Sequence, residues 1–175
     1  MYPRKLLFIF VEGNDDGRFF EKVFIPRLKN RYCMIKIIKY ATMKKEKIDN
    51  FIKSINAMGA DYLYFADINN SPCITSKKEK IRQMYKHINI SKIVIVIREI
   101  ESWYLAGLDY NAYNNLKIAN IGRTDNITKR QFDNLIPKKF ISRIDFMLEI
   151  LKFFSVKEAK RNNKSFKYFT EKYMA

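Results

Sequence analysis

Polar side chains follow three apolar segments of this chain, each at the point where the segment ends. These side chains are Glu12, Asp67, Asn69, Glu99 and Glu101. Carboxylates that are brought together repel one another unless they are protonated or bridged by a cation. Oxygen ligands of this type suit Mg²⁺ or Mn²⁺, which keep some of their waters and leave positions open for phosphate. The residue types therefore indicate a divalent-metal site. For Glu12 alone, a solvated turn or a helix N-cap is an equal alternative.

The overall charge of the chain favours a polyanionic partner. Its 175 residues include 34 lysines and arginines against 18 aspartates and glutamates, which gives a net charge of +16. Such an excess favours nucleic acid, or less often an anionic membrane surface. A genome-wide bias toward lysine is the alternative explanation. A basic surface that holds a nucleic-acid backbone, combined with an acidic metal site, predicts phosphodiester chemistry.

The cysteine and histidine content excludes several other kinds of site. Two cysteines, Cys33 and Cys73, make neither a disulfide framework nor a Cys-type zinc site. A single histidine, His87, excludes metal sites built from several histidines. The apolar run 6–11 is too short for a signal sequence or a membrane span. We therefore expect a cytoplasmic protein with no membrane partner.

Hydrophobic patterning places these acids in an α/β fold. Apolar segments alternate with amphipathic segments of helical period over the first two-thirds of the chain. The expected strands are 6–11, 34–40, 62–66 and 93–97, and the expected helices are 16–27, 45–58 and 76–87. Continuous apolar strands separated by helices predict a parallel, Rossmann-like sheet of about four strands flanked by helices. Ligands bind outside the carboxyl ends of such strands, where the acids are expected to meet.

The pattern changes after about residue 109. Residues 110–126 are Asn-rich and expected to be irregular, whereas 128–135, 142–154 and 165–174 have helical patterns. The sequence thus predicts an α/β domain at 1–110 and a basic helical extension at 111–175 packed on it. The extension holds 14 lysines and arginines against six acids, so it is also a candidate footprint for a phosphate backbone.

Several segments resemble a known family. Residues 8–20, Phe-Ile-Phe-Val-Glu-Gly-Asn-Asp-Asp-Gly-Arg-Phe-Phe, resemble the strand-Glu-Gly opening of TOPRIM domains, which occur in topoisomerases, primases, ribosomal-RNA maturases and OLD-type nucleases. The chain is more similar still to a TOPRIM-like family of mostly uncharacterised prokaryotic proteins, the domain-of-unknown-function 4276 family. The matching segments are Val-Glu-Gly at 11–13, the loop 66–73 ending in Cys, Arg-Glu-Ile-Glu-Ser-Trp-Tyr-Leu at 98–105, and 159–166.

This resemblance implies a Mg²⁺- or Mn²⁺-dependent nuclease or another phosphodiester-processing protein that acts on DNA or RNA. The implied catalytic acids are Glu12, Asp67, Glu99 and Glu101. The implied metal ligands are Glu12, Asp67, Asn69 and Glu101. The implied nucleic-acid contacts are Arg98, Lys160, Arg161, Lys164 and Lys167.

One departure from the TOPRIM pattern keeps a second function open. TOPRIM domains carry Asp-x-Asp after a later strand, and the second acid is Asn69 in this chain. Asn supplies a neutral oxygen, so the alternative is a non-catalytic module that binds nucleic acid or a partner. OLD-type systems pair such a module with an ATPase, which makes an ATPase a possible partner. Trp103 and Tyr104 either stack on a base or pack a helix against the sheet.

Overall fold

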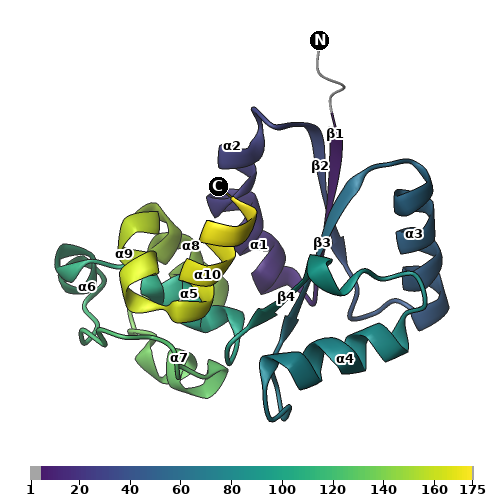
Figure 1. The fold of residues 1–175 in the computed structure, drawn as a ribbon. Coiled ribbons are helices and arrows are strands. Elements are labelled where there is room, and N and C mark those ends of the chain that lie inside the picture. The colour runs from purple at the N-terminus through teal and green to yellow at the C-terminus, as the bar shows by residue number, and fades with distance from the viewer. Residues whose placement is uncertain (1–4, 175) are drawn as a thin grey trace. The chain divides into compact units, whose positions relative to one another are not determined.

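The computed structural model describes residues 5–174 (Figure 1). Their contacts divide the chain between Ile95 and Val96 into two compact units. The first unit carries the sheet and its helices, and the second unit is helical. None of the described helices is long and apolar enough to cross a membrane.

Four parallel strands form the sheet in the order β2-β1-β3-β4. The strands are β1 (Lys5–Val11), β2 (Tyr32–Lys39), β3 (Asp61–Asp67) and β4 (Ile93–Val96). Phe10 of β1 lies opposite Ile38 of β2 on one side and Tyr64 of β3 on the other. The α/β class and the four-stranded parallel sheet predicted from the sequence are therefore confirmed.

Helices cover both faces of this sheet. They are α1 (Asn14–Val23), α2 (Ile25–Leu28), α3 (Lys45–Ala57) and α4 (Ile74–Met84), with a short 3-10 helix, η1 (Ile90–Lys92), before β4. One core cluster joins Phe10 to Ile52 of α3 and Ile81 of α4. Phe20 of α1 meets Phe65 of β3, with ring centroids 4.3 Å apart. Burial on both faces explains why β1, β3 and β4 are continuous apolar runs.

The segment expected to form one helix at 16–27 forms two. Helix α1 ends at Val23, and α2 begins at Ile25. Pro26 lies in the first turn of α2, where a missing backbone N–H breaks no helical hydrogen bond. Proline therefore begins the second helix rather than ending the first.

The second unit contains more helices than the sequence predicted. Its helices are α5 (Ile100–Ala106), α6 (Tyr110–Leu116), α7 (Lys129–Leu135), α8 (Arg143–Lys152), α9 (Val156–Asn162) and α10 (Lys164–Tyr173). The expectation of irregular structure across 110–126 is wrong for its first part, which is α6. Asp109 caps this helix by accepting a hydrogen bond of 2.8 Å from the Ala112 backbone N–H, and Tyr113 and Leu116 are buried. Helix α9 was not predicted.

The second unit also begins earlier than the expected boundary at residue 110, because it includes α5. The ring of Trp103 in α5 packs against Phe166 and Phe169 of α10, with centroids 5.2 and 5.5 Å away. All three side chains are fully buried. This aromatic cluster joins α5 to the C-terminal helices.

Candidate functional site

Tyr40 connects the carboxyl ends of three adjacent strands. It directly follows β2, and its backbone N–H donates to the Val11 carbonyl of β1 at 2.9 Å. Its hydroxyl donates to the Phe65 carbonyl of β3 at 2.8 Å, and its ring stacks on Tyr64 with centroids 4.7 Å apart. Because β1 lies between β2 and β3 in the sheet, the Tyr40 side chain extends across the end of β1, where Glu12 follows.

Three carboxylates act on the Tyr40 hydroxyl. Burial raises the pKa of Tyr40 far above its ordinary value, an interaction with Tyr64 lowers it in part, and the charges of Glu12, Asp16 and Asp67 raise it further. Negative charges disfavour a phenolate only when they lie near it. Glu12 and Asp67, the predicted acids of the first unit, therefore both contribute to the raised pKa of Tyr40. Tyr40 itself stays protonated at any physiological pH.

Asp16 is an acid of this site that the sequence analysis missed. It lies in the first turn of α1 and is half-buried. Its Oδ2 accepts a hydrogen bond of 3.1 Å from the Gly13 backbone N–H, which fixes the turn directly after Glu12. An acid three residues after a helix N-cap is a known capping signal, so the sequence did contain a cue to its position.

A lysine lies beside the first turn of α1. Lys39 ends β2, and its side chain runs against Gly17 of α1. A Cβ placed on Gly17 would lie 3.0 Å from Cε and 3.9 Å from Nζ of Lys39. The absence of a side chain at Gly17 therefore lets the Lys39 ammonium approach the first turn of α1, where Asp16 lies.

The loop after β3 holds Asn69 in a left-handed conformation. Asp67 is the last residue of β3 and is half-buried, whereas Asn69 is exposed with φ of 47°. The Ser71 backbone N–H closes a turn onto the Ile68 carbonyl at 3.1 Å. Asn and Asp adopt this conformation more readily than residues with branched side chains. The turn accordingly explains a short polar residue at position 69, and it admits Asn and Asp alike. Cys73 caps α4, its Sγ accepting from the Ser76 N–H at 3.4 Å.

The two later glutamates belong to the second unit and have partners there. Glu99 precedes α5 and accepts a hydrogen bond from the Lys129 backbone N–H. Glu101 is only 4% exposed and forms an ion pair with Arg143, which also pairs with Asp133. A buried carboxylate is stable when a cation compensates its charge. Arg143 supplies that compensation for Glu101. The two residues therefore form a structural ion pair within the second unit.

Trp103 and Tyr104 are fully buried, so neither ring is exposed to stack on a base. Trp103 donates its Nε1–H to Ser165 Oγ at 2.8 Å, and the Asn163 amide donates to Ser102 Oγ at 3.4 Å. Both aromatic residues therefore pack rather than stack on a base, but their ring partners belong to α10 and α7 and not to the sheet. Segments 98–105 and 159–166 contact each other through this buried polar network.

The five cations predicted to contact nucleic acid differ in exposure and in their distance from acidic side chains. Arg98 is exposed, with φ of 65°, at the end of the segment that follows β4. Arg161 lies 3.3 Å from Glu158, and Lys167 lies 4.0 Å from Glu171. Lys164 is exposed and Lys160 half-buried. Acids on the same helices thus offset part of the positive charge predicted for this surface.

The described part of the chain contains no all-protein metal cage. Within residues 5–174 there is no group of three or more His, Cys, Asp or Glu side chains that could hold a metal ion. Mg²⁺ in phosphate-processing sites commonly uses one or two carboxylates and keeps several waters. Glu12 and Asp67 supply two such carboxylates at the ends of neighbouring strands.

No protein-family model, curated protein or solved structure matches this chain. The interpretation of its site therefore rests on the chain's own residues and their geometry.

Proposed function

We propose that this chain is a TOPRIM-like, Mg²⁺- or Mn²⁺-dependent nuclease, with Glu12 and Asp67 as the principal metal ligands. One observation carries the proposal: Glu12 and Asp67 stand at the carboxyl ends of the neighbouring strands β1 and β3 in a chain of net charge +16. A basic protein attracts polyanions, but carboxylates repel phosphate. A divalent cation bound between the carboxylates and the phosphate would remove this repulsion. Such an arrangement is usual in phosphodiester chemistry.

The residues of the site divide into distinct roles. When bound, the metal would neutralise charge on the reacting phosphate and lower the pKa of a bound water. Glu12 is exposed and thus accessible to a hydrated ion, whereas Asp67 is half-buried at the strand end. Tyr40 remains a neutral hydrogen-bond donor that holds the three strand ends together. Asp16 orders the turn after Glu12, and one of the acids acts as general base.

The test is cleavage of end-labelled DNA and RNA, single- and double-stranded, with Mg²⁺ or Mn²⁺. Glu12→Gln and Asp67→Asn should each abolish metal-dependent cutting while the protein keeps its circular dichroism spectrum. Glu21→Gln is the matched control, because Glu21 is exposed on α1 and the charge change is the same. Undiminished cutting by Glu12→Gln would refute the metal assignment.

A second candidate function follows from Asn69 and Glu101. Asn69 supplies a neutral oxygen where TOPRIM domains have an acid, and Glu101 is compensated by Arg143. Both observations favour a non-catalytic module that binds nucleic acid or a partner, such as an ATPase. Calorimetric titration with Mn²⁺ separates the two functions. The nuclease requires a Mn²⁺ site that Glu12→Gln weakens, whereas the non-catalytic module shows no such site.

A further inference from the structure

One edge of the first unit is strongly basic. Residues 22–45 contain eight lysines and arginines and no acid. This segment comprises the end of α1, all of α2, the edge strand β2 and the loop that leads to α3. Its strand, β2, is an edge strand of the sheet. The positive charge of the chain is therefore concentrated on an element that borders the acidic site.

The lysines of this edge are available to a ligand. Six of them are exposed, and none forms an ion pair with any residue from 5 to 174: Lys22, Lys29, Lys36, Lys39, Lys44 and Lys45. Lysines on an edge strand can prevent pairing with other strands. That role does not account for Lys22, Lys29, Lys44 and Lys45, which lie outside β2.

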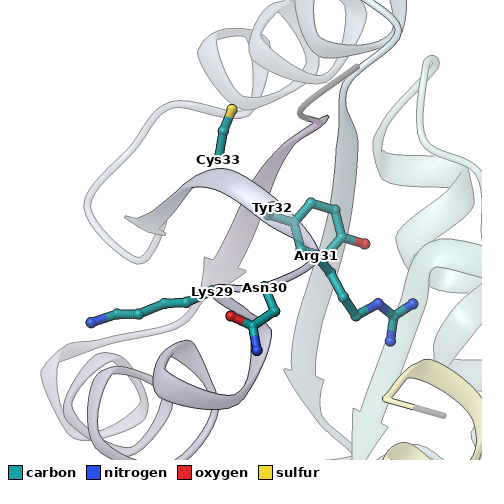
Figure 2. Close-up of a pocket in the computed structure, with 5 residues that line it drawn as sticks. All are labelled: Lys29, Asn30, Arg31, Tyr32 and Cys33. Atoms are coloured by element: carbon teal, nitrogen blue, oxygen red, sulfur yellow. The ribbon is translucent and has the colours of Figure 1, made fainter. Parts of the chain in front are cut away.

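The charges are spread over both faces of the edge rather than gathered around one point, since Lys36 and Lys39 are three residues apart in β2 and point to opposite faces of the sheet. At the start of β2, residues 29–33 line a hollow of about 320 Å³. Figure 2 shows the Lys29 and Arg31 side chains pointing away from each other across this hollow. Two cations arranged in this way do not converge on one small anion. They suit successive phosphates of a longer polyanion.

The length of the edge fits a nucleic-acid strand. From Arg31 to Lys39 the chain advances eight residues, or about 26 Å at ~3.3 Å per residue. Phosphates of one strand in a duplex are ~3.4 Å apart along its axis, so the edge spans about eight of them. At the far end, Lys39 lies against Gly17, next to the turn that Asp16 orders. The basic edge thus ends next to the turn that follows Glu12.

We propose that the β2 edge binds the phosphate backbone of the nucleic acid and directs it to the acids at the carboxyl end of the sheet. This inference rests on the proposed function and assigns the substrate contacts to the first unit. It differs from the footprint at Lys160, Arg161, Lys164 and Lys167 predicted from the sequence. Two of those four cations lie beside acids of their own helices.

The test compares three triple variants that lower the net charge equally. The edge variant carries Lys29→Gln, Lys36→Gln and Lys39→Gln. The rival variant carries Lys160→Gln, Lys164→Gln and Lys167→Gln. The control carries Lys53→Gln, Lys80→Gln and Lys86→Gln, which are exposed residues of the first unit away from β2. Binding of a fluorescent single-stranded 20-mer, as DNA and as RNA, is measured by anisotropy over a salt series in EDTA, where no cutting occurs.

The edge variant should bind about tenfold or more weakly at ~0.1 M salt. Its plot of log K against log salt should be shallower by about 2, since each lost phosphate contact removes ~0.7 from the slope. The control should change affinity less than about threefold. An equal loss in the control, or a loss confined to the rival variant, would overturn the assignment to β2 alone. Absence of any binding by the wild type would overturn the proposed function itself.

Discussion

Replacing Arg143 with methionine decides whether Glu101 is a structural residue or a free metal ligand. Arg143 forms an ion pair with Glu101, whose side chain is 5% exposed. The Arg143 guanidinium also lies 5.0 Å from the Phe132 ring centroid. Methionine keeps the length and most of the packing volume but removes the charge. The variant Arg143→Met therefore leaves a buried carboxylate without the cation that compensates it.

The expected cost follows from that burial. Breaking a buried ion pair from one side costs about 3–5 kcal/mol. The Arg143 side chain is 22% exposed, so water can reach the site. We therefore expect the free energy of unfolding to fall by about 3 kcal/mol, the lower end of that range. For a chain of this length the melting temperature should fall by about 6–12 °C. Fluorescence of Trp103, the only tryptophan and fully buried in the second unit, reports the unfolding directly.

The double variant Arg143→Met with Glu101→Met provides the control. Replacing both partners of a buried pair by apolar side chains is often neutral or stabilising, so the double variant should recover most of the lost stability. A cost below about 1 kcal/mol for Arg143→Met would refute the structural interpretation of Glu101. So would a double variant as unstable as the single one. Glu101 would then return to the candidate metal ligands.

Two further predictions concern stability. A Cβ on Gly107 would lie 2.4 Å from the Phe154 ring, so Gly107→Ala should destabilise the second unit by about 1–3 kcal/mol. Trp103 fluorescence in urea measures this change. An unchanged unfolding midpoint would contradict the close packing of Phe154 on Gly107. Burial raises the pKa of Asp49, but two hydrogen bonds from His87, both 2.8 Å, bring it below its ordinary value. Asp49 therefore stabilises the fold above the pKa of the unfolded chain, and this contribution is lost as pH falls through the folded pKa. The stability difference between wild type and Asp49→Asn should shrink below about pH 4, and a pH-independent difference in urea titrations would contradict the pair.

Much of the fold could be predicted because its signals are local. The β-branched run at 93–97 and the helical spacing of Ile48, Ile52 and Ile55 in α3 give the elements directly. Helix α6 was missed because its sequence, Tyr-Asn-Ala-Tyr-Asn-Asn-Leu, has low intrinsic helix propensity. Burial of Ala112, Tyr113 and Leu116 and the Asp109 cap outweigh that propensity, and burial of this kind is not visible in a short window of sequence.

The candidate site was only partly accessible to sequence reasoning, for the same physical reason. The position of an acid after a strand is a local property, whereas its availability depends on contacts with distant residues. Glu12 and Glu101 look alike in sequence, yet Glu12 is exposed and Glu101 is buried beside Arg143, 42 residues away. Tyr40, which brings the strand ends together, acts through the Phe65 carbonyl, 25 residues away. An acid after an apolar strand is therefore evidence for a metal site only when no cation from the same unit already compensates it. By this criterion Glu12 is the residue on which the nuclease proposal should first be tested.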